Sequence, residues 1–361
     1  MTIGAANPAT NGTGTNGHGN GTAPRCAWAT LMTSEHLLPG LVVFAESLLV
    51  THGSQYPLVV MVTSKLSERG RAIIGSLHPS VVVRDIEPIY PASVATSLAY
   101  ARFNEVWTKL RAFDLDEYDR VVLVDSDMLV RRNMDELFSL SSVFDRTDGK
   151  TAMAASWACT CNPNRIPTYP AEWIPANCGF TPQSHPDSLH SPPQPDVSTP
   201  EPAKLVNSGL VVLSPSASLM QEMIEVINTD PRIPGYRFPD QDFLANFFNE
   251  HSSRTIQYLP WTYNALKKLR LVHPNLWRDQ EVRNVHYILD KPWSLGQPGS
   301  ANNPIEKDAD HEIHSWWWSA FHDLQSKILN SPTQVLKPNK NAALSVSPRD
   351  WNDCVVSYVN L

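Results

Sequence analysis

The chain has 361 residues, 42% of them hydrophobic, and carries 29 basic and 36 acidic side chains for a formal net charge of −7. This is the composition of an ordinary globular protein, and the absence of a basic tract interleaved with aromatic residues argues against nucleic acid as a partner. The most apolar stretch, residues 38–50, is too short to cross a bilayer and is interrupted by Glu46. The N-terminus also lacks the apolar core of a secretory signal, so we expect a cytoplasmic protein without a membrane span.

The first part of the chain alternates between expected strands and expected helices. Residues 1–24 are rich in Gly, Asn, Thr and Ala, cannot bury apolar surface, and are expected to form a disordered tail. Continuous aliphatic runs then predict buried strands at 26–32, 57–63, 80–89 and 120–130. Helical patterns fall between them, at 38–51, 67–77 and 104–115. Apolar strands that alternate with helices are typical of an α/β fold, with a mostly parallel, Rossmann-like sheet flanked by helices.

The second part of the chain is less regular. A Pro- and Ser-rich stretch at 181–203 predicts a long surface insertion. A strand is then expected at 204–215, and helices at 218–228 and 241–250. Residues 331–361 are polar and dotted with Pro, which predicts a loosely packed tail, so we expect a single catalytic domain over 25–330. No G-x-G-x-x-G follows the first strand and no Walker A sequence occurs, which disfavours NAD-type enzymes and P-loop NTPases.

The cysteines form an odd set of five: Cys26, Cys159, Cys161, Cys178 and Cys354. In a chain of this size without a signal peptide, reduced structural thiols are the preferred interpretation. Cys159, Cys161 and Cys178, with His185 and His190 downstream, could bind zinc, but their spacing matches no standard zinc module.

The most informative motif is Asp125-Ser126-Asp127, which follows the buried strand at 120–124. Ligands bind at the carboxyl ends of strands in parallel sheets. Carboxylates two residues apart point the same way in extended backbone and repel each other unless a cation lies between them. Oxygen ligands suit Mg²⁺ or Mn²⁺, which commonly complete their shells with substrate phosphates. The alternative is a surface turn in which an aspartate caps the next segment.

A second polar group follows an expected strand near residue 286. His286 could supply an imidazole as a third ligand, which shifts the preference from Mg²⁺ to Mn²⁺. Lys291 lies close by in the sequence and could neutralise a leaving diphosphate. A structural role for both residues is the alternative.

Five motifs in this order resemble glycosyltransferase family 8, the group that contains glycogenin, bacterial galactosyltransferases and galactinol synthase. They are ATLMTS, WTKLRAF leading into RVVLVDSDMLVRRNMDELF, VNSGLVVL, PDQDFLANFF and HYILDKPW. The resemblance covers residues 27–295. It implies a GT-A fold, a UDP-sugar donor, Mn²⁺ with Mg²⁺ as the alternative, and transfer with retention of the anomeric configuration.

Carried over position by position, the resemblance also implies the site residues. The metal ligands are Asp125, Asp127 and His286. The residues that bind the donor are Leu31, Thr33, Lys109, Ser126, Asn207, Ser208, Gly209 and Lys291. The catalytic residues are Asp240 and Gln241, under the donor sugar, and Lys291, at the diphosphate. The structural alternatives are a plain turn at 207–209 and a helix N-cap at 240–241.

Within the family, the chain is more similar to the galactinol synthase branch, which transfers galactose from UDP-galactose to myo-inositol. This similarity rests on WTYN followed by HPNLW, and on the cysteine-containing segment at 155–182. Glycogenin glucosylates its own tyrosine after the first of these motifs, but no tyrosine lies between Tyr263 and Tyr287 here.

Other functions stay open at this point. They are a UDP-glucose or UDP-N-acetylglucosamine transferase acting on a glycan or protein, and a non-catalytic protein that binds nucleotide sugars. A nucleotidyltransferase is disfavoured, because ATLMTSEHLL lacks the expected Gly-rich loop. A homodimer is one option for the oligomeric state.

Two further groups of residues have no assigned chemistry. The run Trp316-Trp317-Trp318 is expected to pack a C-terminal helix onto the core, with an aromatic platform for a sugar as the alternative. His52, His78 and His273 stand in no pattern and are expected on the surface.

Overall fold

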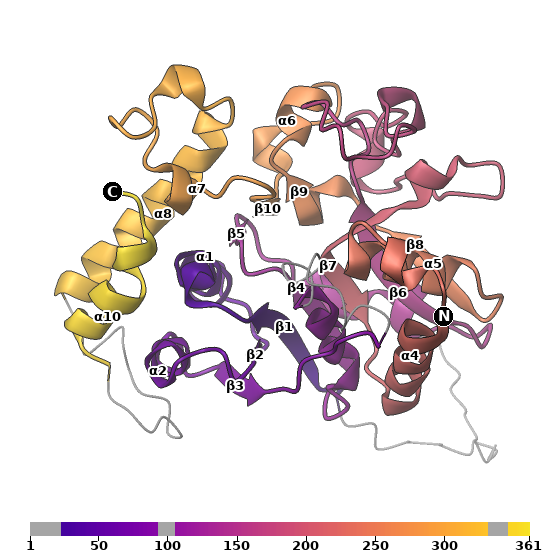
Figure 1. The fold of residues 1–361 in the computed structure, drawn as a ribbon, viewed down its shortest axis with the longest axis horizontal. Helices are drawn as coiled ribbons and strands as arrows, with labels where there is room; N and C mark the ends of the chain where they lie inside the picture. Colours follow the sequence, from indigo (N-terminus) through magenta and orange to yellow (C-terminus); the bar gives the residue numbers. More distant parts are fainter. Residues whose placement is uncertain (1–22, 93–104, 331–345) are drawn as a thin grey trace, which may run out of the picture.

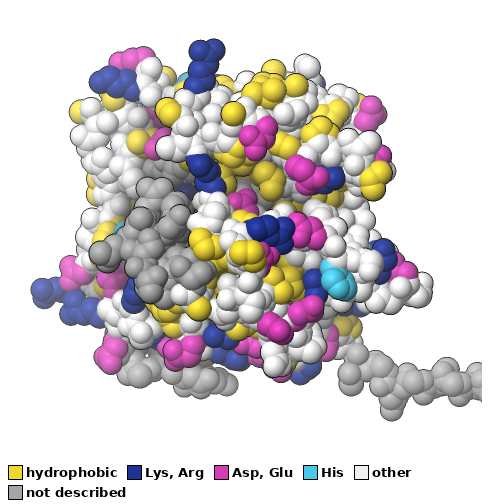
Figure 2. All heavy atoms as spheres, turned by 45° about the vertical axis from the view of Figure 1, so that its right-hand side comes forward, with side chains coloured by type: hydrophobic (Ala, Val, Ile, Leu, Met, Phe, Trp, Pro, Cys, Tyr) yellow, Lys and Arg dark blue, Asp and Glu magenta, His cyan; other side chains and the backbone are white. Residues whose placement is uncertain are grey.

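The computed structural model describes residues 23–92, 105–330 and 346–361 (Figure 1). The tail expected over 1–24 therefore lies almost entirely outside the described residues, as does about half of the tail expected over 331–361. None of the helices within the three described ranges combines the length and apolar character that a membrane span requires. On the face drawn in Figure 2, acidic and basic side chains are intermixed.

A seven-stranded sheet forms the centre of the molecule. From one edge to the other, its strands are β3 (Val81–Asp85), β2 (Leu58–Val62), β1 (Cys26–Met32), β4 (Arg120–Val124), β7 (Val206–Leu213), β6 (Thr151–Trp157) and β8 (Arg254–Tyr258). Neighbours in β3-β2-β1-β4 pair in parallel, and β7 is antiparallel to both β4 and β6. Because β8 again runs parallel to β6, β7 alone among these seven is reversed, and the mostly parallel sheet is confirmed.

Helices cover both faces of this sheet, as the continuous aliphatic strands require. They are α1 (Leu38–Ala45), α2 (Glu68–Ser76), α3 (Ser141–Phe144), α4 (Ala217–Thr229), α5 (Pro239–Asn249) and the 3₁₀ helix η4 (Val106–Asp114). The first helix continues as a π-helical turn, Glu46–Thr51. Serine side chains cap two of the helices: Ser67 accepts from Gly70 N, and Ser216 accepts from Leu219 N. In Figure 1, α1 and α2 lie beside β1–β3, whereas α4 and α5 lie on the side of β6 and β8.

A small second sheet extends the strand that was expected to run through residues 120–130. The chain leaves the main sheet after Val124, and β5 (Met128–Val130) pairs with β10 (Asn284–His286), which in turn pairs with β9 (Ala265–Leu266). The single strand expected over 120–130 is therefore wrong. The turn at 125–127 redirects the chain, and the antiparallel register places His286 opposite Met128.

The C-terminal part of the described chain packs against the body of the molecule. Its helices are α6 (Leu269–Val272), α7 (Pro292–Leu295), α8 (His311–Asn330) and α10 (Pro348–Cys354). Trp317 and Trp318 are buried, and the Trp317 ring lies 5.4 Å from that of Trp293, which confirms that this run packs a helix onto the core. Residues 346–361 correct the expectation of a loose tail, because α10 contacts α2 and buries Trp351.

The Pro- and Ser-rich stretch at 181–203 is irregular and mostly exposed. Its Gln194 side chain accepts a hydrogen bond from Tyr258 N at 2.8 Å and donates one to Tyr258 O at 3.0 Å. This pairing satisfies backbone groups at the outer edge of β8, which would otherwise be open to another strand.

Candidate active site

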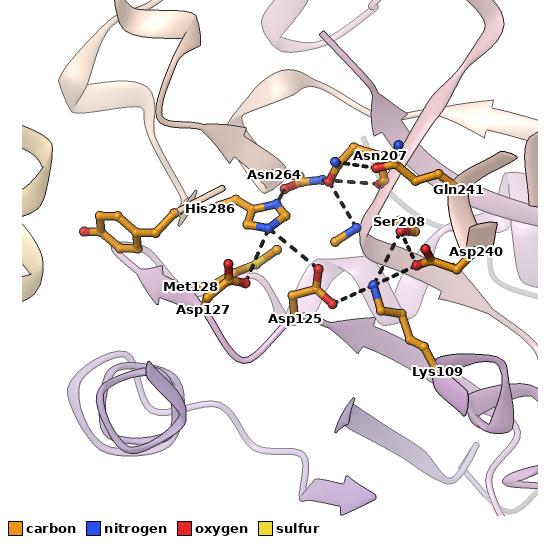
Figure 3. Close-up of polar contacts among 12 residues, drawn as sticks. Lys109, Asp125, Asp127, Met128, Asn207, Ser208, Asp240, Gln241, Asn264 and His286 are labelled. Carbon is orange, nitrogen blue, oxygen red and sulfur yellow. Dashed lines mark hydrogen bonds and ion pairs between the residues drawn. The ribbon is translucent and has the colours of Figure 1, made fainter. Parts of the chain in front are cut away.

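Two carboxylates and an imidazole meet where β4 ends beside β10 (Figure 3). Nε2 of His286 lies 3.6 Å from Oδ2 of Asp125 and 3.4 Å from Oδ1 of Asp127. Asp127 and His286 are buried, and Asp125 is half-buried. The three residues that the family resemblance names as metal ligands are thus brought together, although more than 150 positions separate His286 from the aspartates.

The orientation of the imidazole is fixed from behind by Asn264. Nδ1 of His286 lies 2.9 Å from Oδ1 of Asn264, whose amide nitrogen donates to Oδ1 of Asn207 at 2.8 Å. Because that Asn264 oxygen can only accept, Nδ1 carries the proton and Nε2 faces the carboxylates. Three electron-rich groups then face one another, which a proton on Nε2 or a cation among them relieves. This donor set fits Mn²⁺ or Mg²⁺, and a second hydrogen bond of this kind is typical of metal-ligating histidines.

Two glycines allow the close packing around this centre. A Cβ atom at Gly209 would lie 2.3 Å from Cε1 of His286, so only glycine leaves room for the imidazole. The Gly209 carbonyl also accepts a hydrogen bond from Asp125 N at 2.9 Å. A Cβ at Gly40 would lie 2.8 Å from the carbonyl oxygen of Ser126, so α1 supports the aspartate turn directly.

Two lysines neutralise the carboxylates. Nζ of Lys109, on η4, lies 2.7 Å from Oδ1 of Asp125 and 2.9 Å from Oδ2 of Asp240, while Lys291 pairs with Oδ2 of Asp127. Burial lowers the pKa of Lys109, but Asp125 and Asp240 outweigh that effect and raise it above the usual value. Burial likewise raises the pKa of Asp127, yet Lys291 and His286 outweigh it and hold that pKa well below its usual value.

Polar side chains from β7 and α5 form the floor beside these lysines. Ser208 donates to Oδ2 of Asp240 at 2.6 Å, and Asn207 donates to Oε1 of Gln241 at 2.7 Å. The structure contradicts the two structural alternatives for these residues, a plain turn at 207–209 and a helix N-cap at 240–241. Residues 207–209 belong to a strand rather than a plain turn, and the Asp240 carboxylate contacts Lys109 and Ser208 rather than capping α5.

These residues line a cavity of about 340 Å³, a size that suits a small-molecule site. Its lining includes most of the residues expected in the site: Lys109, Asp125, Asp127, Asn207, Ser208, Asp240, Gln241, His286 and Lys291. Four expected residues are placed otherwise. Leu31 and Thr33 stand at the end of β1 and do not line this cavity, Ser126 is buried in the aspartate turn, and Gly209 lies behind the imidazole.

Two features of the site were not predicted from the sequence. Asn264 was not assigned a role, although it belongs to the WTYN motif that was noted. The second feature is an aromatic wall of Tyr169, Trp173 and Phe238, in which the Trp173 and Phe238 rings stack at 5.3 Å with planes 12° apart. No periodic signal marks this wall, because Tyr169 and Trp173 come from a loop.

The backbone conformation of Leu289 directs the chain back toward the site after β10. Leu289 has φ +62°, in the left-handed region that non-glycine residues seldom adopt. This conformation turns the chain between His286 and Lys291, so that both side chains line the same cavity.

The sequence is similar to those of known glycosyltransferases over most of its length. Residues 30–295 match the model of glycosyl transferase family 8. Galactinol synthase 4 from Arabidopsis thaliana is 28% identical over 299 residues, covering 81% of this chain and 80% of that protein. Galactinol synthase 2 from Solanum lycopersicum is 28% identical over 266 residues, covering 73% and 70%.

Solved structures show the same fold. An active-site mutant of LgtC superposes with a TM-score of 0.51 at 14% identity, covering 91% of this chain and all of that one. The bifunctional glycosyltransferase WbbM gives a TM-score of 0.50 at 16% identity, covering 88% and 52%. The fold is GT-A, and because the family model matches most of the chain, the protein belongs to glycosyl transferase family 8 and is a glycosyltransferase.

Proposed function

We propose that this glycosyltransferase moves galactose from UDP-galactose to myo-inositol, with retention of configuration and with Mn²⁺ as its metal. The observation that carries the proposal is the convergence of Asp125, Asp127 and His286 at one end of a cavity of small-molecule size. The choice of donor and acceptor rests on similarity to galactinol synthases over most of both chains.

The metal would be held by Asp125, Asp127 and the Nε2 atom of His286. This set fits the ion because Nε2 is directed at the carboxylates by the Asn264 hydrogen bond and because an imidazole favours Mn²⁺ over Mg²⁺. When bound, the cation neutralises charge on the donor diphosphate. With only these three residues as ligands, the ion would stay accessible to phosphate oxygens of the donor.

The protein's own cations complete the stabilisation of the leaving group. As the bond between the anomeric carbon and the β-phosphate oxygen breaks, UDP departs with the electron pair. Lys291, at the cavity wall, can shift its ammonium from Asp127 to that phosphate, because charge placed in advance where new charge develops lowers the barrier.

The donor sugar would lie over Asp240 and Gln241. Lys109 and Ser208 contact and orient the Asp240 carboxylate, and Asn207 holds the Gln241 amide. A fixed anionic oxygen stabilises positive charge that develops at the anomeric carbon. The acceptor hydroxyl then forms the new bond to that carbon and gives its proton to the departing diphosphate.

The acceptor would approach along the aromatic wall. Tyr169, Trp173 and Phe238 offer apolar ring faces, onto which the C–H faces of a cyclic polyol can pack. The neighbouring polar groups of Asn162 and Asn164 can meet its hydroxyls.

The proposal is tested by incubating the purified chain with Mn²⁺ and a panel of UDP-sugars, with and without myo-inositol, and identifying the products. We expect UDP-galactose to be consumed fastest and a galactosyl-inositol to form only when inositol is present. Faster turnover of UDP-glucose or UDP-N-acetylglucosamine, or UDP release that inositol never converts to product, would contradict the donor or acceptor assignment.

A further inference from the structure

A second cluster of metal-ligating side chains lies beside the cavity, apart from the aspartate centre. Cys159, Cys161, Cys178 and His273 each direct one ligand atom at a common point, with all four atoms within 4.8 Å of one another. Three of these residues are buried and Cys159 is half-buried, and all three cysteines are free thiols. The cluster corrects one expectation, since His273 is buried rather than on the surface, and it contains neither His185 nor His190.

Hydrogen bonding to His273 alone does not account for this arrangement. Nε2 of His273 lies 3.6 Å from Sγ of Cys159, 3.3 Å from Sγ of Cys161 and 3.6 Å from Sγ of Cys178. One ring nitrogen has either one proton or one lone pair, so it satisfies only one of three neighbouring thiols. Tetrahedral zinc, with bonds of about 2.3 Å to sulfur and about 2.0 Å to nitrogen, places these ligands about 3.5 Å apart. The three measured separations fall around that value.

We propose that Cys159, Cys161, Cys178 and His273 form a structural zinc site. Three thiolates and an imidazole are the ligand set of a closed zinc centre, with no position left for substrate. Zinc also explains why the ligands come from distant parts of the chain without a compact spacing motif. Cys178 and His273 are separated by 95 positions.

A third cluster of metal-ligating side chains, Asp308, Asp310 and His314, is already paired with a cation of the protein, the ammonium group of Lys267. There, Nζ of Lys267 lies 2.9 Å from Nε2 of His314 and 3.5 Å from Oδ2 of Asp310, and Lys268 also pairs with Asp310. Within the described residues, the cysteine sulfurs of this cluster have hydrogen-bond contacts to His273 but accept none from a lysine or arginine side chain. Ionisation of all three thiols would therefore require a bound metal cation.

The position of the cluster indicates which part of the structure the zinc would stabilise. The segment from Cys161 to Cys178 carries Tyr169 and Trp173 of the aromatic wall but contains, within the described chain, only a short 3₁₀ turn at its end, Pro175–Asn177. A metal held by cysteines at both ends of this segment and by His273, which directly follows α6, would fasten the loop to the rest of the domain. The wall of the cavity would then be rigid even though its backbone is irregular.

The first experiment measures metal in the full-length wild-type chain. The protein is purified without a metal-binding tag under reducing conditions, incubated with zinc, freed of excess metal by dialysis, and analysed by mass spectrometry of the elements. We expect about one tightly held zinc per chain. A content below about half an equivalent with all thiols reduced overturns the proposal, whatever any variant does.

The second experiment locates the metal by substitution. Cys178→Ser and His273→Ala should lose the zinc, whereas His273→Cys should retain it, because four cysteines also bind zinc. Cys354→Ala is the matched control, since it removes another buried thiol far from the cluster in sequence. Asp127→Asn should keep the zinc and thereby exclude the aspartate centre as its site. Zinc retained in both Cys178→Ser and His273→Ala, or lost from Asp127→Asn, would contradict the assignment.

Discussion

The two ligand clusters beside the cavity differ in whether a bound ion would remain accessible to substrate. The aspartate centre offers three ligands, faces the cavity and is flanked by Lys109 and Lys291, which pair with its carboxylates. The cysteine cluster offers four ligands, and only its Cys159 contributes to the cavity lining. Three ligands with room for phosphate suit an exchangeable catalytic ion, whereas four soft ligands suit a permanent structural one.

Because of this difference, we expect the two centres to respond differently to the same treatment. Loss of the first metal should stop chemistry without unfolding the protein, and loss of the second should loosen the cavity wall. Substitutions at each site and removal of metal test whether the two centres act independently.

Asp127→Asn should lower kcat on the order of a thousandfold, because it removes a ligand and the charge that holds the metal against the diphosphate. The side chain keeps its shape, so the protein should stay folded, but loss of the ion pair with Lys291 should lower the thermal unfolding midpoint by about a few degrees. Steady-state kinetics and a melting curve measure both. Asp323→Asn, on the exposed side of α8, is the matched control, and activity of the Asp127 variant within a few-fold of it would contradict the metal-binding role.

Asn264→Ala should weaken the apparent affinity for Mn²⁺ about 10- to 100-fold, because the imidazole of His286 loses the hydrogen bond that orients it. Saturating Mn²⁺ should restore most of kcat. Activity titrated against metal concentration measures the shift. A loss that no concentration of Mn²⁺ recovers would show that Asn264 acts on the substrate rather than through His286.

Tyr169→Ala should raise the KM for the acceptor about tenfold, because one ring face of the aromatic wall is lost. The KM for the donor and the slow hydrolysis of donor without acceptor should change little, since the carboxylates and lysines are untouched. Tyr358→Ala removes a tyrosine far from the cavity lining and serves as the control. Equal changes in the KM for the acceptor and the KM for the donor would contradict the proposal that the aromatic wall binds the acceptor alone.

Brief treatment with EDTA should abolish activity while shifting the unfolding midpoint by no more than about 1 °C, because only the exchangeable ion leaves quickly and its site is not needed for folding. Mn²⁺ added afterwards should restore activity. A large fall in the midpoint that follows the loss of activity in time would mean that a single metal serves both roles.

The sequence predicted the parts of this molecule that depend on local patterns. Four aliphatic runs gave the parallel half of the sheet, and the Asp-x-Asp turn was recognisable because it follows Val121–Val124, all buried. In contrast, β6 and β8 were not predicted, because TAMAASW consists mostly of small residues and RTIQY has no strong alternation.

Contacts between distant segments were harder to predict. Asp240 was identified only through the family resemblance, whereas His286 was already proposed from its place after an expected strand. No spacing rule connects either residue to Asp125. His273 was missed altogether, because its partners lie in a loop whose path depends on the tertiary fold. Asn264 was missed for a related reason, since its function is to orient another side chain rather than to carry chemistry itself.

The central claim is that a divalent ion held by Asp125, Asp127 and His286 binds the donor. Calorimetric titration of UDP into the protein, once with Mn²⁺ and once with excess EDTA, tests it most directly. We expect clear binding with Mn²⁺ and a loss of at least about 100-fold in affinity without it, with Asp127→Asn weak under both conditions. Equal affinity with and without the metal, or an Asp127→Asn variant that binds as tightly as the wild type, would contradict the account.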